Sequence, residues 1–136
     1  MAKTVVATCD QEILEYIESI GGQAIMTGNH HERASDRCAE ALSYLEEQDG
    51  MQYDIIVMVQ GDEPMTHPDM ITEAVDPMIK DQSILITNLQ GDISSMEEFE
   101  DRNCIKVVCD LNSNAQYFSR EAIPTKSKID KIPIKK

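Results

Sequence analysis

The spacing of hydrophobic residues predicts strands and helices that alternate along the chain. Near-continuous apolar runs, typical of strands covered on both faces, occupy 3–8, 23–27, 55–60 and 83–88. Apolar residues at helical spacing of three and four positions follow in 10–20, 35–45 and 68–79. Strands that alternate with helices indicate an α/β fold with a largely parallel sheet, flanked by helices.

Polar residues and glycines predict where these elements begin and end. Asp10 is expected to cap the first helix, which should stop at Gly21 and Gly22. Ser35 is expected to cap the second helix, and Pro68 fits the first turn of the third. Further along, a short acidic helix at 96–99 should precede a hairpin, with strands at 104–110 and 115–120.

Charge is distributed unevenly along the 136 residues, whose formal net charge is −13. Five of the twelve basic residues fall in 126–136, which leaves 7 basic and 24 acidic side chains in 1–125. We therefore expect an α/β domain over 1–125 and a basic tail over 126–136. The acidic body argues against binding to nucleic acid, because it repels polyanions. The short apolar runs argue against a membrane span, and the first residues lack a secretory pattern, so we expect a cytoplasmic protein.

The metal-binding residue types give no strong site on their own. None of the four cysteines forms a C-x-x-C pair, so reduced and mostly buried thiols are expected. His30 and His31 are adjacent, but no third ligand stands at a familiar spacing from them. We therefore interpret them as part of a surface loop.

The segment DIIVMVQGDEPM, residues 54–65, contains the most informative candidate chemistry. The predicted strand at 55–60 ends in Gln60 and is followed at once by Gly61, Asp62 and Glu63. One interpretation is a turn whose acidic side chains face water. The other is a functional site, because ligands of α/β sheets bind outside the carboxyl ends of the strands. The pattern alone leaves both open.

Six ordered segments resemble one enzyme family. They are VVATCD (5–10), GGQAIMT (21–27), HERASDRCAE (31–40), VQGDEPM (59–65), IKVVCD (105–110) and YFSREAIP (117–124). Their order and spacing are similar to those of CMP-Kdo synthetases, the 3-deoxy-manno-octulosonate cytidylyltransferases. The resemblance implies a Rossmann-like nucleotidyltransferase fold. It also implies an enzyme that couples CTP to the sugar acid Kdo, with release of pyrophosphate, for lipopolysaccharide synthesis.

The resemblance also implies roles for particular residues. Asp62 matches the family's catalytic aspartate that binds Mg²⁺, and Gln60 matches a glutamine that contacts the sugar acid. Segment 31–37 matches a loop that lies against the cytidine, with Arg37 in agreement with the family pattern and Ser35 as a conservative replacement of its threonine. For Arg37 the alternative is a surface cation on a helix, paired with Asp36 or Glu40.

Two positions of the same loop depart from the family. Arg33 and Ala34 stand where the family has serine and glycine. These changes are expected to alter selectivity for the sugar or the nucleotide, with solvent or a salt bridge to Glu32 or Asp36 as the alternative for Arg33.

Two parts of the family pattern have no counterpart in residues 1–136, namely an arginine-rich phosphate loop and a later segment with a second metal-binding aspartate. The fold is therefore expected to be incomplete at both ends and the chain inactive alone. An apolar edge left uncovered favours a homodimer. Alternatives are a non-catalytic remnant, an interaction module, or a synthetase for another CMP-sugar, of the sialic-acid type or with a modified octulosonate.

Overall fold

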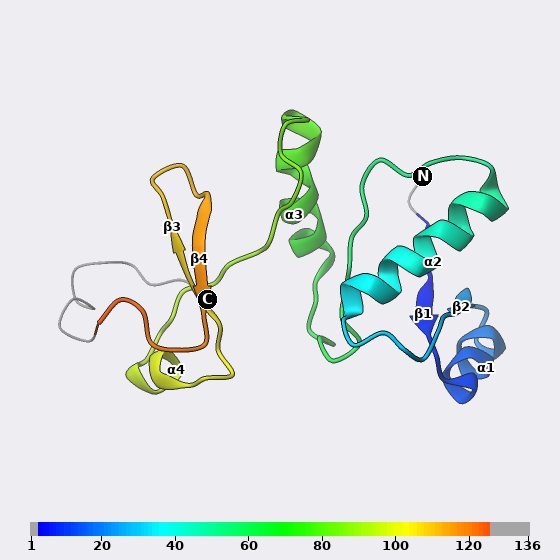
Figure 1. The fold of residues 1–136 in the computed structure, drawn as a ribbon, viewed down its shortest axis with the longest axis horizontal. Coiled ribbons are helices and arrows are strands. Elements are labelled where there is room, and N and C mark those ends of the chain that lie inside the picture. The colour runs from blue at the N-terminus through cyan, green and yellow to red at the C-terminus, as the bar shows by residue number, and fades with distance from the viewer. Residues whose placement is uncertain (1–2, 126–136) are drawn as a thin grey trace. The chain divides into compact units, whose positions relative to one another are not determined.

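The computed structural model describes residues 3–125, which contain helices and short strands (Figure 1). The chain divides into two units, the first ending at Val75 and the second beginning at Asp76. The elements in order are β1 (Val6–Thr8), α1 (Gln11–Ser19), β2 (Ala24–Met26), α2 (Ala34–Asp49), α3 (Pro68–Lys80), α4 (Met96–Glu100), β3 (Lys106–Cys109) and β4 (Ala115–Ser119). Because the boundary falls inside α3, each unit is described by itself.

The first unit is built on a β–α–β arrangement that confirms the predicted α/β class. β1 pairs with β2 in parallel, in the register Val6 with Ala24 and Thr8 with Met26. Helix α1 connects them, and both α1 and α2 contact the strand pair. Asp10 caps α1 as predicted, since its carboxylate accepts hydrogen bonds from the backbone N–H groups of Glu12 and Ile13.

Helix α2 begins differently from the prediction. The residue at its N-cap is Arg33, in extended conformation, and no side chain caps the helix. The prediction of Ser35 as the cap is therefore wrong. Ser35 is already the second helical residue, where its own backbone is committed to the helix. At the other end Gly50 closes α2, with a φ of 64° that most other residues disfavour.

The predicted strands at 55–60 and 83–88 are wrong for the described residues. Neither segment forms a strand, and neither pairs with β1 or β2. Side chains from Ile56 to Val59 are instead 42–51% exposed. The apolar pattern indicates only that burial of these side chains would be favourable. A strand, however, also requires a hydrogen-bonded neighbour along its edge, and residues 3–125 supply none here.

The second unit confirms the predicted hairpin and short helix. β3 and β4 pair antiparallel, with Lys106 opposite Ser119 and Val108 opposite Tyr117. Ser95 caps helix α4, because its hydroxyl accepts a hydrogen bond from the N–H of Glu98. Lys106, on β3, is fully buried, and its ammonium donates to the carbonyls of Asp101, Cys104 and Arg120 at 2.7, 2.7 and 3.0 Å.

The buried apolar core is small in each unit. Ala41 and Leu45 of α2 are the buried apolar residues of the described first unit, and Phe99 and Val107 are those of the second. Within residues 3–125, no helix combines the length and the apolar character needed to cross a membrane. The predicted basic tail at 126–136 lies outside the described residues.

Candidate functional site

The carboxyl ends of β1 and β2 lie side by side and form the base of the candidate site. Thr27, directly after β2, donates from its backbone N–H and from its hydroxyl to the carbonyl of Thr8, at 2.8 and 3.1 Å. Both threonines are buried. In an α/β sheet this edge is where ligands bind, so the loop that leaves Thr27 begins at the expected position.

Arg37, a residue of α2, forms hydrogen bonds that hold this loop against the helix. Its Nη1 group donates to the hydroxyl of Thr27 and, at 3.2 Å, to the carbonyl of Gly28. In the described part of the chain Arg37 forms no ion pair, so the alternative pairing with Asp36 or Glu40 is wrong. Because a guanidinium carries five N–H donors, Nε and Nη2 remain available to a ligand.

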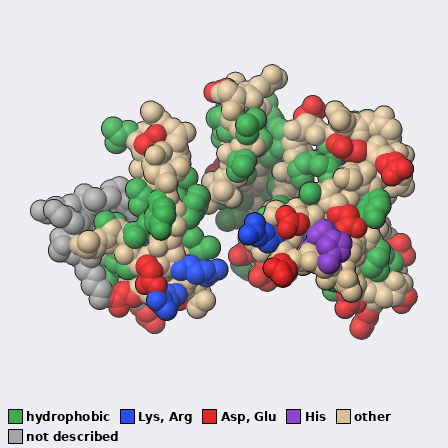
Figure 2. All heavy atoms as spheres, in the orientation of Figure 1, with side chains coloured by type: hydrophobic (Ala, Val, Ile, Leu, Met, Phe, Trp, Pro, Cys, Tyr) green, Lys and Arg blue, Asp and Glu red, His purple; other side chains and the backbone are tan. Residues whose placement is uncertain are grey.

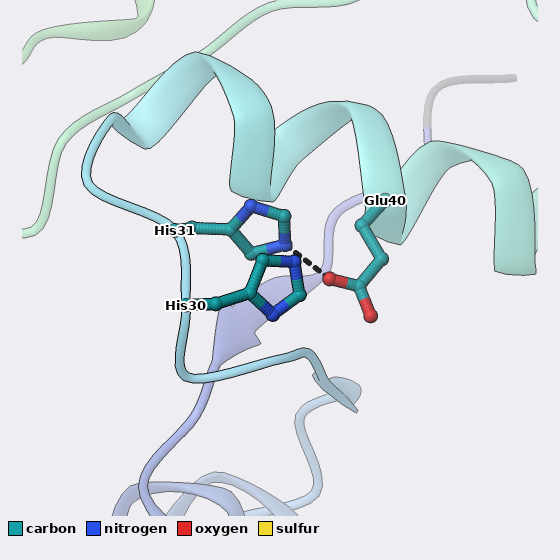
Figure 3. A group of neighbouring side chains, drawn as sticks. All are labelled: His30, His31 and Glu40. Carbon is teal, nitrogen blue, oxygen red and sulfur yellow. Dashed lines mark hydrogen bonds and ion pairs between the residues drawn. The ribbon is translucent and has the colours of Figure 1, made fainter.

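Glu40 holds the other side of the same loop (Figure 3). Its two carboxylate oxygens accept from the N–H of Gly28 at 3.0 and 3.1 Å, and one also shares a short hydrogen bond with Nε2 of His31. The bond from His31, and then that from Gly28, hold the pKa of the Glu40 carboxyl below its usual value. His30 lies against His31, with ring centroids 4.2 Å apart.

This cluster corrects the sequence-based interpretation of the two histidines. A third residue with a ligand atom does lie close to both, and it is Glu40. The spacing hides it, because His30 and His31 belong to the loop while Glu40 belongs to the helix that follows. Arg37 and Glu40 stand three positions apart on α2 and so share the face that meets the loop. That spacing is the signal from which Glu40 could have been found.

The residues around the start of α2 are open to solvent. Arg33, Ala34 and Ser35 are all exposed. Arg33 contributes its backbone carbonyl to the N–H of Arg37 at 3.3 Å, whereas its side chain has no hydrogen bond or ion pair within residues 3–125. The alternative of a salt bridge from Arg33 to Glu32 or Asp36 is therefore not found in the described residues. On the visible face, acidic side chains border the histidines, and basic side chains lie beyond them (Figure 2).

The acidic segment after residue 59 forms a turn. The N–H of Glu63 donates to the carbonyl of Gln60 at 3.1 Å, and Thr66 donates to the carbonyl of Glu63 through its N–H and its hydroxyl. The side chains of Gln60 and Asp62 are exposed and have no hydrogen-bond partner in the described part of the chain. The turn interpretation is correct for the backbone, and the Asp62 carboxylate is free to accept a ligand.

Comparison with known proteins shows the family to which this chain belongs. A family model described as cytidylyltransferase matches residues 1–134. The chain belongs to the cytidylyltransferase family. Among curated proteins, the 3-deoxy-manno-octulosonate cytidylyltransferase of Geotalea daltonii is 41% identical over 124 residues, and that of Syntrophus aciditrophicus is 44% identical over 119. These matches cover 91% and 88% of this chain.

A solved structure of a related protein supports the same assignment. It is described as a CMP:2-keto-3-deoxy-manno-octonic acid synthetase in complex with CTP, and it matches 99% of this chain with a TM-score of 0.83 and 32% identity. The likeness confirms the nucleotidyltransferase fold expected from the sequence. The chain spans 47% of the length of both curated relatives and 53% of the solved chain, so it corresponds to about half of such a cytidylyltransferase.

Proposed function

We propose that this chain forms part of a cytidylyltransferase that joins CMP from CTP to a 3-deoxy-octulosonate-type sugar acid. The observation that carries the proposal is the extended likeness to proteins of that name, together with a solved relative described as a CTP complex. The reaction would release pyrophosphate and supply an activated sugar for lipopolysaccharide synthesis in the cytoplasm.

The residues of the β2–α2 loop are proposed to meet the nucleotide. Arg37 keeps the loop against the carboxyl ends of the strands and retains free N–H donors, which suit hydroxyl, carbonyl or phosphate oxygens. Arg33, Ala34 and Ser35 stand exposed beside it at the start of α2. A fixed loop with open side chains orients a ligand at low cost in conformational entropy.

The turn at 60–63 is proposed to meet the sugar acid and a magnesium ion. The Gln60 amide offers both a donor and an acceptor to a hydroxylated carboxylate. Asp62 fits an ion of this kind, because its exposed carboxylate has no partner among residues 3–125 and carboxylate oxygen is the ligand that Mg²⁺ prefers. When bound, such an ion neutralises charge on the phosphates while the sugar hydroxyl attacks the α-phosphorus. Asp62 then has the role of holding it.

Association of two copies is also proposed. The segment from Ile56 to Val59 exposes four consecutive apolar side chains, more than an isolated soluble unit normally leaves in water. A second copy can cover such a segment by pairing along its backbone.

The test of the reaction is a chimera between this chain and a complete relative. Residues 4–125 replace the matching half of a 3-deoxy-manno-octulosonate cytidylyltransferase, and pyrophosphate release is measured with CTP, Kdo and Mg²⁺. We expect turnover in the chimera and none from the 136-residue chain by itself. A chimera that folds and binds CTP but never releases pyrophosphate above the protein-free rate would contradict the proposal.

A further inference from the structure

The loop between β2 and α2 brings together three side chains with the atoms that transition metals prefer. His30, His31 and Glu40 each offer one ligand atom, and these atoms all lie within 4.8 Å of one another. Figure 3 shows the three side chains gathered between the loop and α2. Two imidazole nitrogens with one carboxylate oxygen match the ligand set of zinc-type ions, and three protein ligands leave a fourth position open.

The spacing of the atoms is compatible with such an ion. Ligands at about 2.0–2.1 Å in a tetrahedral arrangement lie roughly 3.3 Å from one another. His31 and Glu40 already share a hydrogen bond, so an ion there replaces the proton between them. His30 is exposed, and its ring lies against that of His31, with centroids 4.2 Å apart.

The surroundings hold the ligands in place, as outer contacts do in known metal sites. The Gly28 N–H donates to both oxygens of Glu40, and Arg37 in turn holds the Gly28 carbonyl. His31 and Glu40 are largely protected, with side chains 12% and 23% exposed. Gly28 also leaves room for His30, because a Cβ at that position would lie 2.4–2.5 Å from two atoms of the His30 ring.

We propose that His30, His31 and Glu40 form a binding site for one divalent transition-metal ion of the zinc type, separate from the magnesium site proposed at Asp62. The bound ion joins the loop to α2 and so stiffens the approach to Arg33 and Arg37. This site goes beyond the proposed reaction, and its test does not depend on catalysis.

The test measures metal binding by the untagged 136-residue chain. Zn²⁺ is titrated by calorimetry, and Co²⁺ by absorption spectroscopy, which distinguishes nitrogen and oxygen ligands from the thiolates of the four cysteines. We expect one ion per chain, a Co²⁺ spectrum without a thiolate band, and a higher melting temperature with Zn²⁺. His30→Ala should weaken binding at least about tenfold.

A matched control comes from the remaining histidine. His67 is exposed beside Asp69, and His67→Ala removes an imidazole outside the cluster. We expect it to bind Zn²⁺ like the unaltered chain, within about twofold, well below the loss expected for a missing ligand. A second variant, Gly28→Ala, keeps all three ligands but pushes the His30 ring aside, and should also weaken binding.

Three outcomes would overturn the site. They are no binding, equal loss in His30→Ala and His67→Ala, or a thiolate band with Co²⁺. Melting of each variant without metal shows whether it folds. Should His30→Ala fail to fold, Gly28→Ala decides instead, and unchanged affinity in that variant refutes the role of His30.

Discussion

The Asp62 carboxylate lies in an exposed turn and has no partner among residues 3–125, so neither oxygen is already engaged. In the chimera with a complete relative, Asp62→Asn should therefore lower kcat for pyrophosphate release at least about a hundredfold, since an amide lacks the charge that holds the ion. Glu63→Gln, the same change one residue further, is the control and should retain activity. Equal kcat for Asp62→Asn and the unaltered chimera at saturating Mg²⁺ would leave Asp62 with a turn role only.

Arg33 stands where the family resemblance predicts a serine, and its exposed side chain has no hydrogen bond or ion pair in the described structure. Replacing Arg33 and Ala34 in the chimera by serine and glycine should change the ratio of kcat/KM for CTP over UTP, or for Kdo over related sugar acids. A contact from a guanidinium is worth about 1–3 kcal/mol, or roughly ten- to a hundredfold in that ratio. Ratios that all stay within about threefold would show that Arg33 only meets solvent.

Among single residues, the sequence best predicted the roles of those whose hydrogen-bond partners are close in the chain. Asp10 could be assigned as a cap because its hydrogen bonds reach only two and three positions along the chain. Glu40 could not, since its partners are twelve and nine positions earlier and depend on how the loop folds back on α2. The roles of Gln60, Asp62 and Ser35 came from resemblance and stay predictions.

Among the elements, the β3–β4 hairpin depends on Asp110 for its turn. The carboxylate accepts from the N–H groups of Asn112 and Asn114 and from the side-chain amide of Asn114, each at 2.9 Å. The hydrogen bond from the Asn114 side chain, and then that from its backbone, lower the pKa of Asp110. A carboxyl with a lowered pKa stabilises the folded hairpin above its unfolded pKa, and this contribution is lost as the pH falls through the folded value.

The hairpin should therefore lose protection in acid. We expect the protection factors of the β3 and β4 amides to fall below about pH 4, the range in which an aspartate titrates. Asp110→Asn keeps the shape of the side chain but not its charge, so its hairpin should be less protected at neutral pH and less sensitive to acid. Hydrogen exchange measured by NMR on both chains checks this. Identical pH profiles for the two would rule out a role for the charge.

The elements that were predicted correctly are those whose partners stand nearby in the sequence. β1 and β2 are separated by one helix, and β3 and β4 by a short turn. The segments 55–60 and 83–88 have equally strong apolar patterns, yet they form no strand, because pairing depends on neighbours that periodicity does not describe. Apolar periodicity indicates that burial would stabilise a segment, but it does not show which strand would pair with that segment.

For the whole molecule, burial is too limited to expect high stability. Two buried apolar side chains in each described unit provide little of the burial that drives folding, while Ile56 to Val59, Leu85 and Ile86 remain exposed. We expect an unfolding temperature that rises with protein concentration, because association covers exposed apolar surface. Calorimetry over a hundredfold range of concentration, with sedimentation at the same concentrations, measures this. A monomer with a sharp, concentration-independent transition would contradict this expectation. The variant Ile56→Ser should associate more weakly, because it removes one exposed apolar side chain.

The buried ammonium of Lys106 has a chemical consequence for the surface that reagents can reach. A deprotonated amine attacks an acylating reagent with its free electron pair, whereas Lys106 is enclosed with all three of its donor positions directed at carbonyl oxygens. Lys80, whose side chain is 74% exposed, offers a reference in the same unit. In a folded sample, mass spectrometry should find Lys80 acylated and Lys106 spared, and the two should react alike once denaturant is added. The rate at which Lys106 is acylated therefore measures how often the second unit opens around this residue. The measurement requires no substrate.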